Sequence, residues 1–335
     1  MAIKPHKNRI QQANSKLSFA LPAQHETPQP RGHNMPEIEL NIPNEWGHLE
    51  AVVVGHGRSM GAAPTLDSAF DPTSKLHLSR GTYPDAPEVA AQLDGLAEML
   101  DREGISVLRP TNLEDVEQVF ARDVGLVIDS TFIRSRTIEA RSDEWKGVAP
   151  ILGDTPWTPL PEHVHMEGGD VVVLDSALFV GVTSRPDWMD LQVSRTYPSA
   201  LEFLKSTFPH REVVGLELHK DDRDPLKCAL HLDCAYMPLG GDCAIICSEA
   251  FVQEEQLKFL KKKHPSFIEV SLEEAALLQT NLLFTAPDTL VIDPRFVRLG
   301  RALEEKGFRL ISCPLDKVGR MGGLFRCSTL PLRRS

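Results

Sequence analysis

The chain has 335 residues, of which 41% are hydrophobic and 25% are charged, and its formal net charge is -11. These values are ordinary for a soluble globular protein with one large domain or two small ones. The negative charge argues against a nucleic-acid partner, because phosphate binding requires a basic face. No apolar run approaches the roughly 18 residues of a membrane span, so no membrane partner is expected. An acidic surface also suits a cationic small molecule.

The chain has six cysteines, at positions 228, 234, 243, 247, 313 and 327, and none of them forms a C-x-x-C pair. This density is far below that of a disulfide scaffold, which predicts reduced thiols and a cytoplasmic protein. The first 25 residues carry only basic charges, at Lys4, Lys7, Arg9 and Lys16. Two interpretations of this segment stay open: a disordered tail, which we favour, and a mitochondrial targeting sequence.

Order is expected to begin near Ile38. Residues 1–37 are polar, proline-rich and without periodicity, so they are predicted to be a disordered tail before a single domain over residues 38–335. Leu49 to Gly55 is predicted to be a buried strand, because a β-branched apolar run ends at glycine. Pro87 to Glu103 is predicted to be a helix, because its leucines and valine recur on one face and Gly104 follows as a stop signal.

One pattern then occurs four times along the chain. Each copy has an apolar run, a turn that contains aspartate and a second apolar run, which is typical of a β-hairpin. Three of the four copies are followed by a predicted helix, so the chain is expected to be one α/β domain of repeated modules. The hairpins are 125–134, 171–182, 235–247 and 281–293, and the helices are 188–208, 250–263 and 296–306.

Four short segments at the edges of these apolar runs concentrate unusual polar residues. Side chains at such places can project into a cleft from a rigid element, as functional sites require. The segments are Phe120 to Asp123, Glu167 to Asp170, His231 to Asp233, and Gly322 to Thr329.

Cys327 is the candidate nucleophile. A thiol becomes strongly nucleophilic when its pKa falls below about 8.5, and both the neighbouring Arg326 and a cationic substrate could lower it. The glycine pair at 322–323 would let the backbone approach a ligand closely. From spacing alone, a buried structural cysteine is the favoured alternative.

His231 and Asp233 are separated by one residue, so in a strand they would point to the same face and could form a general acid/base pair. A core histidine beside a solvated aspartate fits the same spacing. Glu167 and Asp170 flank two glycines before a strand, and a tight turn with solvated acids is the alternative there. His163 and His165 precede these acids, but they lie in a proline-flanked loop without familiar zinc spacing, so no metal is expected.

Together, the four segments resemble the guanidino-group-modifying superfamily of arginine deiminases, dimethylargininases and amidinotransferases, over roughly Leu40 to Arg334. The resemblance implies a pentein-type fold, a five-bladed α/β propeller of repeated ββαβ modules with pseudo-fivefold symmetry. It also implies a small guanidino substrate, such as arginine or a derivative, and no cofactor. The oligomeric state is left open, and a homo-oligomer is one possibility.

The resemblance also implies a role for each matching residue. Cys327 would be the nucleophile, His231 the proton shuttle, and Glu167 the residue that orients the histidine. A planar cation with paired N–H donors suits a grip by two carboxylates. The remaining residues would bind substrate: Asp123 and Asp233 the guanidinium, Asp170 and Gly169 the region of the amine, and Arg141 and Arg185 a carboxylate. A place behind the residues that contact substrate is the alternative for Asp170.

The motifs are divided between two reactions. Asn44 to Trp46, Gly81 to Asp85 and the Arg333-Arg334 ending resemble amidinotransferases, whereas the Glu167 to Asp170 and Arg326 to Ser328 segments resemble hydrolases. We favour a hydrolase that acts on C–N bonds of linear amidines, because the matching acids form the substrate cage itself. An amidinotransferase is the alternative, and a catalytically silent binding or scaffold protein is a further one.

Overall fold

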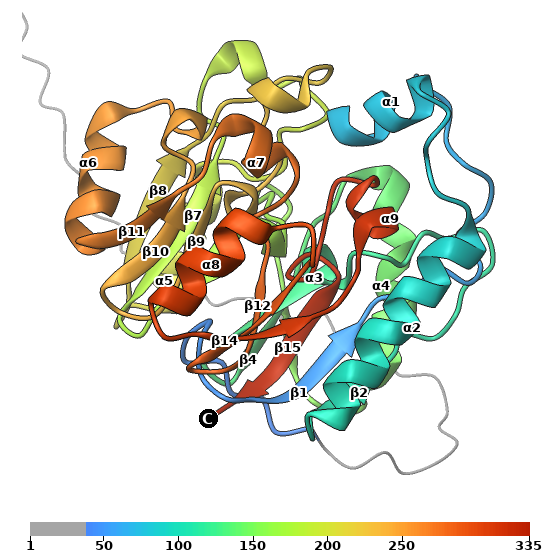
Figure 1. Cartoon of the computed structure of the whole chain (residues 1–335), viewed down its shortest axis with the longest axis horizontal. Helices are drawn as coiled ribbons and strands as arrows, with labels where there is room; N and C mark the ends of the chain where they lie inside the picture. Colours follow the sequence, from blue (N-terminus) through green and yellow to red (C-terminus); the bar gives the residue numbers. More distant parts are fainter. Residues whose placement is uncertain (1–37) are drawn as a thin grey trace, which may run out of the picture. The chain divides into compact units, whose positions relative to one another are not determined.

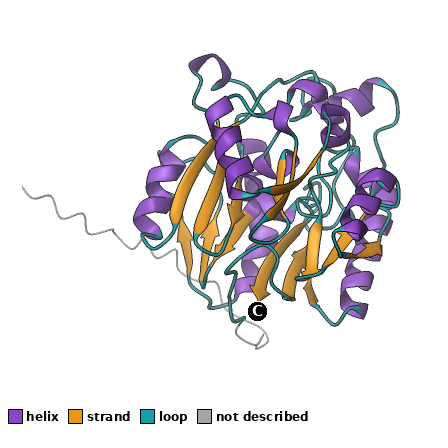
Figure 2. Ribbon diagram, turned by 60° about the vertical axis from the view of Figure 1, so that its left-hand side comes forward, coloured by secondary structure: helices purple, strands orange, loops and turns teal. Residues whose placement is uncertain are grey.

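Five separate three-stranded sheets make up the β-structure of the protein, a computed structural model that describes residues 38–335 (Figures 1 and 2). The predicted tail of residues 1–37 lies outside the described residues. The strands are β1 (Leu49–Val54), β2 (Ser106–Leu108), β3 (Gly125–Ile128), β4 (Thr131–Arg134), β5 (Trp157–Pro159), β6 (Val171–Val173), β7 (Ala177–Val182), β8 (Glu212–Glu217), β9 (Tyr236–Pro238), β10 (Cys243–Ile246), β11 (Ser266–Glu269), β12 (Leu283–Ala286), β13 (Thr289–Ile292), β14 (Arg309–Ser312) and β15 (Thr329–Arg334).

Each sheet follows one plan, in which a central strand pairs antiparallel with one neighbour and parallel with the other. A parallel neighbour requires a crossover connection, and a helix supplies it in every sheet. The protein is therefore built from ββαβ modules. The helices are α1 (Pro72–Ser79), α2 (Ala86–Arg102), α3 (Ala121–Val124), α4 (Trp145–Leu152), α5 (Ser199–Thr207), α6 (Glu254–Lys263), α7 (Leu272–Ala276), α8 (Val297–Glu305) and α9 (Asp316–Gly319).

One of the five modules combines the two ends of the described chain. β15 pairs antiparallel with β1, with Leu49 opposite Arg334 and Val54 opposite Thr329. Figure 1 shows the red C-terminal strand beside the blue first strand. Because β15 follows Cys327 directly, this pairing fixes the candidate nucleophile relative to the start of the domain.

The predicted strand, helix and hairpins are confirmed. The four hairpins are the antiparallel pairs β3–β4, β6–β7, β9–β10 and β12–β13. In the first of them, Asp129 has a φ of 53°, a left-handed conformation that aspartate tolerates in a tight turn. Helix α2 begins with a capping box between Asp85 and Glu88 and buries its leucine face completely.

The helix predicted over 188–208 is shorter than expected. Only a 3-10 turn forms at Pro186–Trp188, and α5 begins at Ser199, directly after Pro198. Proline lacks an N–H group and clashes with the preceding turn, so a helix cannot continue through it. The intervening residues instead form a loop, which reaches the candidate site through Arg195.

The buried hydrophobic side chains form two clusters under these sheets. Leu93, Leu96 and Leu100 of α2 have no exposed surface, which ties the helix to its own module. No helix within residues 38–335 is both long and apolar enough to cross a membrane.

Candidate active site

In each of the five modules, polar side chains lie just before one strand: β3, β6, β9, β12 or β15. Because the modules repeat, these positions are equivalent, and three of them contribute side chains to one pocket of about 200 Å³. The polar residues are Asp123 before β3, Glu167 and Asp170 before β6, His231 and Asp233 before β9, Asn281 before β12, and Cys327 before β15.

The pocket is lined by Cys327, His231 and Asp123, three of the residues to which the sequence analysis assigned roles. All three side chains are buried. Further charged residues in its lining are the acids Asp71, Asp115 and Glu117 and the bases Arg141 and Arg195. Burial raises the pKa of Glu117 to about 7, despite the opposing effect of the Arg141 charge. Acids outnumber arginines in this lining, which suits a cationic ligand.

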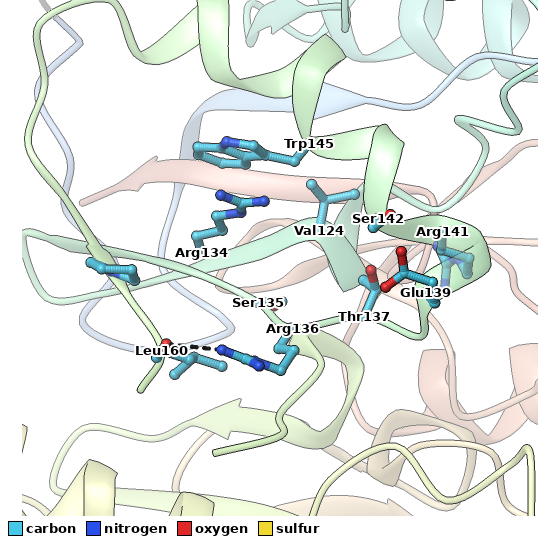
Figure 3. A pocket seen from close by; sticks show the side chains of 11 residues that line it. Val124, Arg134, Ser135, Arg136, Thr137, Glu139, Arg141, Ser142, Trp145 and Leu160 are labelled. Atoms are coloured by element: carbon cyan, nitrogen blue, oxygen red, sulfur yellow. Dashed lines mark hydrogen bonds between the residues drawn. The ribbon is translucent and has the colours of Figure 1, made fainter. Parts of the chain in front are cut away.

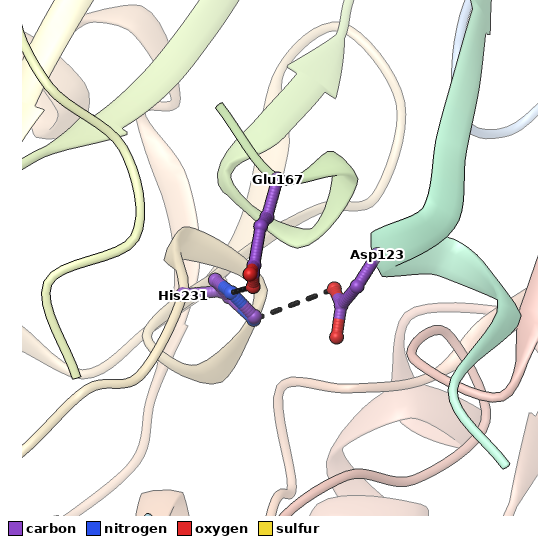
Figure 4. Close-up of side chains that lie close together, drawn as sticks. All are labelled: Asp123, Glu167 and His231. Atoms are coloured by element: carbon purple, nitrogen blue, oxygen red, sulfur yellow. Dashed lines mark hydrogen bonds and ion pairs between the residues drawn. The ribbon is translucent and has the colours of Figure 1, made fainter. Parts of the chain in front are cut away.

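His231 lies between two carboxylates (Figure 4). Its Nε2 is 2.8 Å from Glu167 Oε2, and its Nδ1 is 3.6 Å from Asp123 Oδ1. Burial alone would lower the pKa of His231, but the charges of Asp123 and Asp170 raise it well above its ordinary value. The residue is therefore held as a proton donor. His231 precedes a 3-10 turn, Leu232–Cys234, so the prediction of a strand at this place is wrong.

Glu167 orients the histidine and is itself held by an arginine. Arg195 Nη1 donates to Oε1 at 3.2 Å and to Oε2 at 3.1 Å. Burial would raise the pKa of Glu167, but the charge of Arg195 and the bond to His231 hold it well below its ordinary value. The carboxylate therefore stays ionised, and it can fix the orientation and charge of the imidazole ring.

Asp123 has one engaged oxygen and one free oxygen. Arg141 Nη1 donates to Oδ2 at 2.8 Å, while Oδ1 accepts no hydrogen bond from the described residues. Arg141 also forms a two-bond pair with Glu144, at 2.7 and 3.0 Å. A buried carboxylate oxygen without a donor is costly unless a ligand supplies one. The free oxygen of Asp123 thus marks a place for a cationic N–H group.

Cys327 is held by Asn281 and Asp233. Asn281 Nδ2 donates to the sulfur at 3.1 Å, and the thiol donates to Asp233 Oδ2 at 3.6 Å. Asn281 Oδ1 also accepts the Cys327 N–H at 3.0 Å. The hydrogen bond with Cys234, burial and the charge of Asp233 raise the pKa of Cys327 well above its ordinary value. In this structure Cys327 is therefore a thiol.

Arg326 does not act on the thiol in the way the sequence suggested. Its guanidinium is paired with Asp233 at 2.8 Å and with Glu45 at 2.8 Å, and it donates to the carbonyl of Val171 at 2.7 Å. Its positive charge is therefore compensated by two buried acids, and the expected fall in the pKa of Cys327 is not observed. Arg326 instead ties Asp233 into the wall behind the nucleophile.

Gly169 and Asp170 support the histidine from behind. A Cβ atom at Gly169 would lie 2.6 Å from His231 Nδ1, so only glycine permits this close approach. Asp170 Oδ1 accepts the N–H of Leu232 at 3.0 Å, which fixes the turn that carries His231. Burial raises the pKa of Asp170. Neither residue lines the pocket.

Of the two arginines predicted to bind a carboxylate, the structure brings only Arg141 to the pocket. Arg185 is exposed, pairs with Asp187 at 3.2 Å and stacks on Trp188 at 4.4 Å. Two residues that the sequence analysis missed are Arg195 and Asn281. Neither belongs to a recognisable motif, and only the repeat of polar positions before each hairpin could have pointed to Asn281.

The acids and histidine of the site also form the one group with metal-ligand geometry found within residues 38–335. Ligand atoms of Asp123, Glu167 and His231 lie within 4.8 Å of one another. The guanidinium groups of Arg141 and Arg195 already neutralise the two carboxylates. Two fixed cations at this place would repel a metal ion, so the residues present fit a metal poorly. His163 and His165 do not join this group.

A family model described as "N,N dimethylarginine dimethylhydrolase, eukaryotic" matches residues 85–334. The chain belongs to this family. A similar protein is the uncharacterized YkgA of Bacillus subtilis, 29% identical over 242 residues, which are 69% of this chain and 78% of YkgA. Another is inosamine-phosphate amidinotransferase 1 of Streptomyces griseus, 25% identical over 364 residues, with 88% of this chain and 97% of that protein covered.

Solved structures of guanidino-modifying enzymes share the fold of this family member. An amidinotransferase of saxitoxin biosynthesis from Microseira wollei has a TM-score of 0.68 at 21% identity, covering 88% of this chain and 97% of its own. The N-terminal domain of a cyanobacterial arginine dihydrolase, bound to product, has a TM-score of 0.68 at 19% identity, covering 85% and 97%. Both hydrolases and amidinotransferases therefore occur among the similar proteins.

Proposed function

We propose that this protein is a cysteine-dependent hydrolase that cleaves a C–N bond of a guanidino or ureido group in arginine or an arginine-like substrate. The observation that carries the proposal is the meeting of three groups in one buried pocket: the Cys327 thiol, the His231 proton donor and the free oxygen of Asp123. This set offers a nucleophile, an acid and a cation-binding carboxylate. Membership of a dimethylarginine-hydrolase family supports the same reaction class.

Substrate binding comes first in the proposed reaction. The free Oδ1 of Asp123 accepts one N–H of the guanidinium. Asp233 gives up its contact with the Cys327 thiol and accepts a second N–H of the guanidinium instead. Cys327 then releases its proton to water, because the bound cation stabilises the thiolate electrostatically and compensates for the surroundings that raise the pKa of Cys327. The nucleophile is thus activated by its own substrate.

The chemical steps use the thiolate and His231. The Cys327 sulfur adds to the central guanidinium carbon, and one C–N bond breaks as His231 gives its proton to the departing amine. The result is a covalent thiouronium-type intermediate. His231, now neutral, takes a proton from water, the hydroxide adds to the same carbon, and the C–S bond breaks. The products are the amine and a ureido compound, with Cys327 and His231 restored.

An amidinotransferase is the second candidate, because amidinotransferases that match this chain are covered over 97% of their own length. The first half of the reaction would be the same, and an amine acceptor would replace water.

The five modules support a further structural proposal, a closed five-bladed propeller of pentein type. The pairing of β15 with β1 across the ends of the described chain is the feature that favours closure.

The deciding experiment is product identification by mass spectrometry. The protein is incubated with arginine, methylated arginines, agmatine and citrulline, each with and without glycine as an acceptor. A hydrolase releases a ureido product in both conditions, whereas an amidinotransferase forms a guanidino product only with glycine or another amine. Cys327→Ser is the control and should abolish turnover. A protein that binds one of these compounds but turns over none of them would be a binding protein instead.

A further inference from the structure

Arg122 lies directly before Asp123 in α3 and joins two segments of the site. It is 5% exposed and does not line the reaction pocket. Its main-chain N–H donates to the carbonyl of Cys327 at 3.0 Å, and its side-chain Nε donates to the carbonyl of Arg326 at 3.3 Å. Bonds to two consecutive carbonyls fix the turn that carries Asp123 against the segment that carries the nucleophile.

A third segment of the site packs on the same residue. A Cβ atom at Gly168 would lie 2.1 Å from the carbonyl oxygen of Arg122, so only glycine permits this close approach. Gly168 directly follows Glu167, whose carboxylate orients His231. The segments that carry the cation-binding acid, the nucleophile and the partner of the histidine therefore meet at Arg122.

The guanidinium of Arg122 has no acid at hydrogen-bonding distance within residues 38–335. Its Nη2 lies 3.9 Å from Glu45 Oε2 and makes no hydrogen bond with any described residue. Glu45 is itself engaged, because Arg326 holds it at 2.8 Å. A buried cation is normally paired and hydrogen-bonded. The charge of Arg122 is therefore only partly compensated.

Two other arginines of the site differ from Arg122 in this respect. Arg141 lines the reaction pocket and a neighbouring pocket of about 240 Å³, where Figure 3 shows it on the same helical turn as Glu139. Its guanidinium donates to Asp123 at 2.8 Å and to Glu144 at 2.7 Å. Arg195 donates to Glu167 at 3.1 Å. The charges of these two arginines are thus balanced by fixed acids.

The charge of Arg122 favours a thiolate at Cys327. Burial and the charge of Arg326 lower the pKa of Arg122 to about 10, so the group is still a cation at neutral pH. A negative charge on Cys327 would raise that pKa again. Because this attraction acts on both groups, Arg122 opposes the effect of Asp233 on the thiol. The groups around the sulfur are Asp233, Cys234, His231, Asn281, Arg326 and Arg122, with Asp123 in the same pocket lining.

We propose that Arg122 is a positioning residue, which holds the turn of Asp123 against the main chain of Cys327 and stabilises the thiolate by its charge. The inference rests on the proposed function, in which a thiolate attacks a cation held by Asp123. Arg122 does not line the pocket, so it acts through these two residues.

The rate at which iodoacetamide alkylates Cys327, followed as a function of pH by mass spectrometry of the Cys327 peptide, tests the charge. Arg122→Gln removes the cation, so the midpoint of the profile should rise by about one pH unit, and alkylation at neutral pH should be about tenfold slower. Arg122→Lys keeps the cation and should restore the wild-type profile. Arg122→Met, neutral and of similar length, replaces the Gln variant if that one does not fold, since Glu45 retains its pair with Arg326.

The kinetics of Arg122→Lys with arginine as substrate test the positioning. Its kcat should fall about tenfold although its alkylation profile is that of the wild type, because the bond from Nε to the Arg326 carbonyl is lost. Alkylation requires no turnover. A wild-type protein that does not convert arginine would therefore count against the proposed function and leave the effect of the charge measurable.

Arg211→Gln is the matched control. Arg211 is also buried and donates to a main-chain carbonyl, that of Pro43 at 3.2 Å, but it pairs with Asp129 in the β3–β4 turn and does not line the pocket. Its variant should be less stable and keep the wild-type alkylation profile. The proposal is overturned if the neutral variants of Arg122 keep that profile, if Arg122→Lys fails to restore it or has the wild-type kcat, or if Arg211→Gln shifts it equally.

Discussion

At the scale of single residues, the environment of Cys327 opposes the negative charge that the proposed reaction requires. The thiol faces the carboxylate of Asp233 at 3.6 Å and is buried, and both features raise its pKa. Asn281 acts in the other direction, because its N–H donates to the sulfur at 3.1 Å and favours a thiolate. A resting thiol that ionises only over a bound cation would be protected from other electrophiles.

Asp233→Asn should therefore change two properties in opposite directions. Loss of the negative charge lowers the pKa of Cys327, so the free protein should react faster with iodoacetamide at neutral pH, about tenfold for each pKa unit. Turnover should nevertheless fall, because a carboxylate that grips the substrate is gone. Alkylation rates and steady-state kinetics measure the two effects. Slower alkylation together with unchanged kinetics would show that Asp233 neither restrains the thiol nor contacts substrate.

Asp123→Asn should raise KM and lower kcat together. The variant keeps the shape of the side chain but removes the charge of the free oxygen that lies 3.6 Å from His231. A charge-assisted hydrogen bond contributes about 1.5–3 kcal/mol, which predicts a loss in kcat/KM of about tenfold to a hundredfold. kcat falls as well, because His231 loses a charge that favours its protonated form. Asp67→Asn, at an exposed site, is the control, and equal effects of the two substitutions would count against the cation cage.

Two substitutions test the contacts of Asn281. Asn281→Asp retains the oxygen that accepts the N–H groups of Cys327 and Leu324, but it replaces the N–H donor to sulfur with a negative oxygen. Its alkylation should be slower than wild type, and its melting temperature should fall, because the new charge is buried without a partner. Asn281→Ala leaves two buried N–H groups unpaired and should lose about 1–3 kcal/mol of stability for each. If Asn281→Asp reacted as fast as wild type, the Asn281 donor would have no influence on the thiol.

At the scale of the elements, the sequence predicted what short-range patterns determine. The hairpin β3–β4, for example, follows from two apolar runs around Asp129, whose left-handed conformation suits the turn. The candidate residues before the hairpins were found because their motifs are local as well. The nucleophile and the histidine, however, are brought together only when β15 pairs with β1 at the opposite end of the domain.

The errors of the sequence analysis arise from long-range contacts. Arg185 was favoured because it follows β7, but Arg195 reaches Glu167 from a loop that was predicted to be helical. The ion pairs of Asp123 with Arg141 and of Arg326 with Glu45 connect residues 18 and 281 positions apart. No local spacing encodes such partners, since burial and assembly decide which charges meet.

The segment before β1 is predicted to stabilise the site through Glu45. Glu45 pairs with Arg326 at 2.8 Å and is almost fully buried, so Glu45→Gln leaves a buried guanidinium with incomplete compensation. Removal of one partner of a buried pair costs about 3–5 kcal/mol. Urea denaturation should show this loss, whereas Lys258→Gln, in an exposed pair of α6, should change stability by about 1 kcal/mol or less. Equal midpoints for Glu45→Gln and wild type would contradict the prediction.

At the scale of the whole molecule, charge is distributed unevenly. The candidate reaction pocket is lined by four acids, Asp71, Asp115, Glu117 and Asp123, and by two arginines, Arg141 and Arg195, within a protein of net charge -11. A cationic ligand would therefore be drawn to this pocket.

This distribution predicts a dependence of ligand binding on ionic strength. Arginine and citrulline have similar shapes, but arginine carries a guanidinium and citrulline a neutral ureido group. The concentration of each that protects Cys327 from iodoacetamide measures its affinity for the pocket. As potassium chloride rises from about 0.01 to about 1 M, the screening length falls from about 30 to about 3 Å. The arginine concentration required should increase several-fold, because attraction to the acids is screened.

Citrulline should respond far less, since its ureido group gains nothing from that attraction, and the alkylation rate without any ligand is the control for salt effects on the thiol itself. A protecting concentration of arginine that does not change with salt, or that changes in parallel with citrulline, would mean that the four acids do not select a cation.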